Sequence, residues 1–107
     1  MSDTVTHTAE IWVWSNGINP ASWHFITLSG EAGEAVAAHE AMRRLELGKG
    51  RGFGSVKVTA QIGETLWHTS VFPSQSADGY LLPIKAAVRK VEKLKEGDSV
   101  LATLDLL

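Results

Sequence analysis

The chain of 107 residues contains no cysteine, only three prolines, and no apolar run near the roughly 20 residues of a membrane span. Without cysteine there are no disulfides, no thiolate chemistry and no zinc sites built on sulfur. The first residues do not combine a basic region with an apolar stretch, so no signal peptide is indicated. We therefore expect a cytoplasmic protein without a membrane segment.

The chain also lacks an excess of positive charge, because the formal net charge is −2. Nucleic-acid-binding domains are usually basic, since neutralised phosphates supply most of their affinity. The total charge therefore argues against a nucleic-acid partner. Basic residues nevertheless gather after Arg43, which leaves a local basic patch open.

The sequence predicts one domain over residues 1–107. A chain of this length can bury one hydrophobic core without disulfides or metal sites. Alternation and helical spacing predict strands over 5–14, 23–28, 56–62, 65–72 and 100–106 and helices over 29–47 and 83–94. The order β-β-α-β-β-α-β predicts a mainly β fold with two α-helices, a small closed or split β-barrel with both helices outside.

The clearest local feature is a hairpin around Gly63-Glu64, which suits a two-residue loop with glycine first. A loop this short fixes the pairing, because each residue then has one partner. The predicted pairs are Ala60 with Trp67, Val58 with Thr69, and Val56 with Val71. The other face of the hairpin is then polar and solvated.

Histidine is present but scattered, at positions 7, 24, 39 and 68. No pair has metal-binding spacing, so we predict neither a metal site nor a cofactor. His68 lies on the solvated hairpin face beside Thr59 and Ser70, which makes it the best histidine candidate for acid–base work. Ser70 lacks the G-x-S-x-G surroundings of a nucleophile. We keep His68 and Ser70 as candidate ligand-binding residues.

Four tryptophans are many for this length. Trp67 is expected in the core. Trp12 and Trp14 fall on the face opposite Ile11 and Val13, where they either cover a second apolar layer or line a binding groove.

Lys85 and Arg89 lie four residues apart, on one face near the start of the second predicted helix. Two cations there repel each other unless an anion joins them, and Tyr80 just upstream adds a phenol. We predict an anion site at Tyr80, Lys85 and Arg89. The alternative is a solvated basic helix face.

The glycine run over 48–54 superficially suggests a phosphate loop, but it leads from a helix into a strand, the reverse of a dinucleotide loop. A flexible connector is the better interpretation. Residues 51–58 also approach the RNP1 signature of RNA-recognition motifs. Ser55 and Val58 replace the stacking aromatics of that motif, so we do not infer RNA binding.

Two resemblances go beyond these patterns. Nearly the whole chain resembles domain-of-unknown-function family 1905 (DUF1905), small bacterial β-barrel domains with no established catalytic residues, some of which accompany a second domain linked with bacteriocin protection. The blocks that carry this resemblance are 23–25, 51–58, 62–63 with Trp67, 69–73, 79–89 and 97–98. Leu82 to Leu104 is similar to swapped-hairpin repressors and antitoxins, in which two chains form one barrel and basic side chains contact DNA.

Three functions remain open from the sequence. The first is a non-catalytic binding or interaction module for a small anionic ligand or a protein partner, as a monomer or homodimer. The second is a DNA-binding regulator of swapped-hairpin type that uses Arg51 and the Arg89-Lys90-Lys93 side. The third is an enzyme that uses His68, Ser70 or Lys85.

Overall fold

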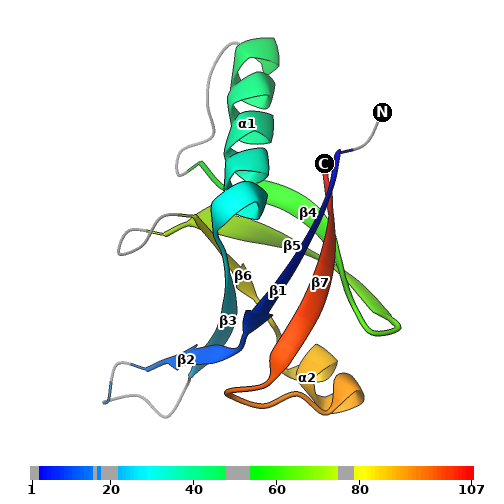
Figure 1. The fold of residues 1–107 in the computed structure, drawn as a ribbon. Coiled ribbons are helices and arrows are strands. Elements are labelled where there is room, and N and C mark those ends of the chain that lie inside the picture. Colours follow the sequence, from blue (N-terminus) through cyan, green and yellow to red (C-terminus); the bar gives the residue numbers. More distant parts are fainter. Residues whose placement is uncertain (1–2, 16, 18–21, 48–53, 75–78) are drawn as a thin grey trace.

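The structure, a computed structural model, describes residues 3–15, 17, 22–47, 54–74 and 79–107. The elements in chain order are β1 (Asp3–Glu10), β2 (Trp12–Trp14), β3 (Trp23–Leu28), α1 (Gly30–Leu47), β4 (Val56–Ile62), β5 (Thr65–Pro73), β6 (Tyr80–Pro83), α2 (Ala86–Glu92) and β7 (Ser99–Leu106). The fold is mainly β with two helices in the described residues, as predicted. The strands form one curled half-barrel sheet that is open rather than closed (Figure 1).

The sheet has the order β1-β7-β4-β5-β6-β3-β2, with every neighbouring pair antiparallel. Its two edges, β1 and β2, follow each other in the chain and meet at Ile11. The backbone N–H of Ile11 donates to the Asp98 carbonyl (2.9 Å), and its carbonyl accepts from the Gly97 N–H (2.8 Å). The single strand predicted over 5–14 is therefore wrong, because the chain bends at Ile11 and its halves pair with different strands.

The predicted hairpin register is confirmed pair by pair, with Ala60 opposite Trp67, Val58 opposite Thr69 and Val56 opposite Val71. Gly63 opens the two-residue loop with φ +60°, a conformation that glycine adopts without a side-chain clash. Alternate residues of β4 are buried, from Val56 to Ile62. The turn and the alternation specify the same register.

The core lies inside the curl of the sheet and draws on all the long strands. The first helix contributes Ala32 and Val36, and the second contributes Val88. The later turns of α1 stand beyond the sheet (Figure 1), and Met42 and Leu45 are 57% and 78% exposed. The helix predicted over 29–47 is thus buried only near its start.

The segment before α2 differs most from prediction. Pro83 does not open the helix but ends a further strand, β6, where it lies opposite Phe25. The helix begins at Ala86, three residues later, and Lys85 is its N-cap in extended conformation. A missing N–H suits the end of a strand as well as the start of a helix, so Pro83 alone does not distinguish them. The observed order is β-β-β-α-β-β-β-α-β.

The glycine connector predicted over 48–54 and the helix end predicted at Gly48 fall almost wholly outside the described residues.

Candidate binding site

Aromatic side chains gather on the outer face of β2, β3 and β6. Trp12 pairs with Phe25 and Trp14 pairs with Trp23 across β2 and β3, and directly paired residues project from the same side of a sheet. The face continues through the pairs Phe25–Pro83 and Phe72–Leu81. We call this surface the aromatic face; its members are Trp12, Trp14, Trp23, Phe25, Phe72, Leu81 and Pro83.

Ring contacts hold part of the aromatic face in place. The rings of Trp12 and Phe25 lie 5.1 Å apart at 37°, and those of Trp23 and Phe25 lie 6.5 Å apart at 12°. The indole N–H of Trp12 donates to Thr27 Oγ1 at 2.9 Å, which fixes its orientation. Trp14 and Trp23 remain 50% and 56% exposed over a groove of about 690 Å³. Exposed apolar patches of this kind commonly mark binding surfaces.

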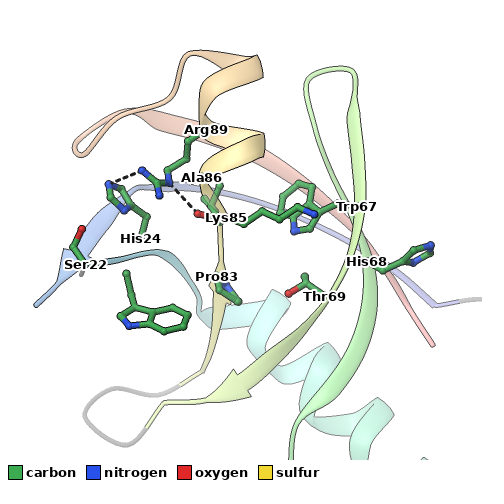
Figure 2. A pocket seen from close by; sticks show the side chains of 11 residues that line it. Ser22, His24, Trp67, His68, Thr69, Pro83, Lys85, Ala86 and Arg89 are labelled. Atoms are coloured by element: carbon green, nitrogen blue, oxygen red, sulfur yellow. Dashed lines mark hydrogen bonds between the residues drawn. The ribbon is translucent and has the colours of Figure 1, made fainter. Parts of the chain in front are cut away.

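A second hollow, which we call the basic pocket, opens between β5 and the chain leading from β6 into α2 (Figure 2). The ladder between β5 and β6 contains only two pairs, Phe72 with Leu81 and Pro73 with Tyr80, after which the strands diverge. The resulting space measures about 400 Å³ and reaches the buried side chains of Trp67 and Ile84. The split in the sheet therefore creates the pocket.

Lys85 and Arg89 give this pocket its charge. Arg89 Nε donates to the Ile84 carbonyl (3.1 Å) and Nη1 donates to His24 Nε2 (3.4 Å), so the guanidinium is held against the pocket. Lys85 is exposed and extends in the direction of Trp67 (Figure 2). No acidic residue is among those that line the pocket, and neither cation makes an ion pair with a described residue.

His24 contributes a neutral polar group. Burial and the positive charge of Arg89 lower the pKa of His24, while the negative charge of Glu96 opposes them. Because Nε2 accepts from Arg89, we assign the ring proton to Nδ1. That Nδ1 atom is buried and has no hydrogen-bond partner among the described residues. His24 therefore carries a buried donor that no described residue satisfies.

The other predicted site residues lie elsewhere or face elsewhere. His68 contributes to the rim of the basic pocket, but its imidazole points away from the other side chains (Figure 2), and Nδ1 lies 3.1 Å from Thr59 Oγ1. Ser70 shares a separate shallow hollow with His68 on the solvated hairpin face. The basic pocket includes His68 and Lys85 but not Ser70, and the hollow on the hairpin includes His68 and Ser70 but not Lys85.

Tyr80 does not line the basic pocket. It is buried, and burial followed by the charge of Glu40 on α1 raises the pKa of its phenol. The structure thus brings Lys85 and Arg89 together and separates Tyr80 from them. The sequence analysis missed two residues of the site, Trp23 and His24, because it treated residues 23–28 only as a predicted strand. The signal available was a histidine flanked by two aromatic residues.

Within the described ranges, no group of three or more histidine, aspartate or glutamate residues could hold a metal ion. No described helix has both the length and the hydropathy to span a membrane. A search of the curated proteins finds no match. A family model described as a domain of unknown function, DUF1905, matches residues 7–104, which confirms the resemblance seen in the sequence.

Proposed function

The chain belongs to the DUF1905 family, whose description assigns no activity, and we propose that it is a non-catalytic binding module for a small organic anion. The observation that carries the proposal is the basic pocket, where two cations meet apolar walls without a lining carboxylate. Pockets of this size with few convergent polar groups are typical of small-molecule sites. Guanidinium and ammonium groups in such a setting favour a carboxylate or a phosphate.

The hydrogen bonds of Arg89 support an anion rather than a bare cationic surface. Two contacts, to Ile84 and His24, hold the guanidinium in one orientation and leave its remaining N–H groups free to donate. A held donor loses less rotational freedom on binding than a mobile one.

The proposal omits catalysis because the two histidines near the pocket are poorly suited to it. The basic lone pair of His24 accepts from Arg89, and the ring of His68 points away. It omits DNA because Arg89 is turned into the pocket, where its contacts to Ile84 and His24 keep it from the exposed Lys90 on α2 and Lys93 at the C-cap of this helix.

Titration of the labelled protein with inorganic phosphate and with acetate, followed by two-dimensional NMR, tests the proposal. We expect saturable shifts at His24, the Trp67 indole and the first turn of α2. Lys85→Ala should weaken binding up to about fivefold, since exposed charge pairs contribute at most about 1 kcal/mol. Lys90→Ala is the matched control, because Lys90 is exposed on the same helix and does not line the pocket.

Binding that is lost equally in both lysine variants would show a diffuse charge effect and contradict the proposal. The absence of saturable shifts with either anion would contradict it as well.

A further inference from the structure

We infer that the anion bound in the basic pocket carries a planar aromatic ring, which stacks on the aromatic face at Trp23. This inference rests on the proposed function and names the class of ligand. Its starting observation is that Trp23 and Pro83 line both hollows. The aromatic face and the basic pocket therefore form one continuous surface, apolar at one end and cationic at the other.

The two ends of this surface are close together along the chain. Pro83 borders both hollows, and Lys85 follows it by two residues. Two residues of extended chain span roughly 7 Å, which is the scale of an aromatic ring with an attached phosphate or carboxylate.

The geometry of the rings favours a flat group over a branched one. Trp23 and Phe25 are nearly parallel, at 12°, and Trp14 lies opposite Trp23 in the ladder. Together they present broad ring faces, against which planar rings stack with an offset. No charged residue lines the groove beside them, so charge complementarity places the anion at the Lys85 end.

Phenyl phosphate, inorganic phosphate and phenol are probes that separate the two ends of this surface. Stacking on an exposed aromatic ring corresponds to roughly a three- to tenfold gain in affinity. We therefore expect phenyl phosphate to bind roughly three to ten times more tightly than inorganic phosphate, measured by NMR titration. Phenol, which lacks the anionic group, should bind more weakly than phenyl phosphate.

Variants then show which residues account for the tighter binding of phenyl phosphate. Trp23→Ala should remove the advantage of phenyl phosphate, so that its affinity and that of inorganic phosphate come within about twofold of each other. Trp23→Phe, which keeps a ring, should retain most of the advantage. Leu66→Ala is the control for loss of an exposed apolar side chain, since Leu66 is 60% exposed and lines neither hollow. Lys85→Ala should weaken both phosphates.

The outcomes separate this inference from the proposed function. If inorganic phosphate and phenyl phosphate bind equally well, or if Trp23→Ala weakens both alike, the ring site is wrong and the anion site stands. If neither phosphate binds, the anion site itself is wrong and the ring inference falls with it. Tighter binding of phenyl phosphate that depends on both Trp23 and Lys85 supports the two together.

Discussion

The hairpin of β4 and β5 and the strand group of β2, β3 and β6 solve the same packing problem differently. Both present an apolar inner face to the core, with Val58 and Ala60 on one side and Ile26 and Leu82 on the other. The outer face of the hairpin is mostly polar, with Leu66 as an exposed exception outside the aromatic face, whereas the outer face of the other group carries half-exposed tryptophans. The core requires only the inner faces, so the outer aromatic residues call for a different explanation.

This difference shows where a binding surface can be added to a small sheet. A strand that is apolar on both faces needs a second layer to cover it, as helices do in other folds. The described helices leave the outer face of β2 and β3 uncovered, and α1 stands beyond the sheet (Figure 1). We therefore relate the aromatic face to a ligand rather than to the stability of the domain.

The largest test of this comparison uses the tryptophans themselves. Trp67 lies on the inner face at 6% exposure, whereas Trp14 is 50% exposed on the outer face. Trp67→Ala should lower the free energy of unfolding by about 3–5 kcal/mol, because it removes a buried ring and leaves a cavity. Trp14→Ala should lower it by at most about 1 kcal/mol. Urea unfolding of both variants measures the difference.

A similar loss in the two variants would break the comparison, because the aromatic face would then be a structural layer. Met42→Ala is a useful control for the removal of a large exposed side chain, since Met42 lies on α1 away from both faces.

The second test concerns the turn that fixes the hairpin. A Cβ at Gly63 would collide with the carboxylate of Glu92, which accepts a hydrogen bond from Thr65 Oγ1 at 2.5 Å. Gly63→Ala should therefore cost about 2 kcal/mol, from backbone strain and from loss of this bond. Gly97→Ala has positive φ but open space around it, so backbone strain alone should cost about 1 kcal/mol.

Chemical denaturation of both glycine variants, alone and combined with Thr65→Val, separates backbone strain from loss of the hydrogen bond. The difference in free energy of unfolding between Gly63→Ala and Gly97→Ala should become smaller when Thr65→Val has already removed the hydrogen bond. A gap that persists unchanged would contradict this account of Glu92.

The sequence predicted the hairpin well and the β6 region poorly, for identifiable reasons. Alternation and a Gly63-Glu64 turn are local signals that both point to one register. The short strand of β6 forms only two pairs with β5, its neighbour in the chain, and its longer ladder is with β3, more than fifty residues away. Pro83 fits either a strand end or a helix start, so only the long-range pairing decides its place.

The site was predictable in part. Lys85 and Arg89 were found because helical spacing joins residues four apart, although Lys85 proved to be an N-cap. For Trp12 and Trp14 the sequence left two alternatives open, a binding groove or a second apolar layer. His24 and Trp23 could not be joined to Lys85 from the sequence, since β3 meets the start of α2 through long-range contacts alone: the ladder with β6, the Ile84–His24 backbone hydrogen bond and the Arg89–His24 contact.

The smallest test concerns the pH dependence of stability that the inner face acquires from His24. This residue alternates with the buried residues Ile26 and Leu28 along β3, so it lies on the inner face of the sheet. The inner face of the hairpin carries only apolar or hydroxyl side chains. Burial and Arg89 lower its pKa below the usual 6.5, so the folded state holds this imidazole neutral at a pH where the unfolded chain is protonated. The contribution of His24 to stability is thus present above the unfolded pKa and is lost as the pH falls through the folded pKa.

Thermal unfolding as a function of pH should therefore show a smaller loss of stability on acidification in His24→Gln than in the unaltered chain. An equal or larger acid loss in His24→Gln would mean that this imidazole is not held neutral against Arg89, and the two halves of the sheet would then differ only in their outer faces.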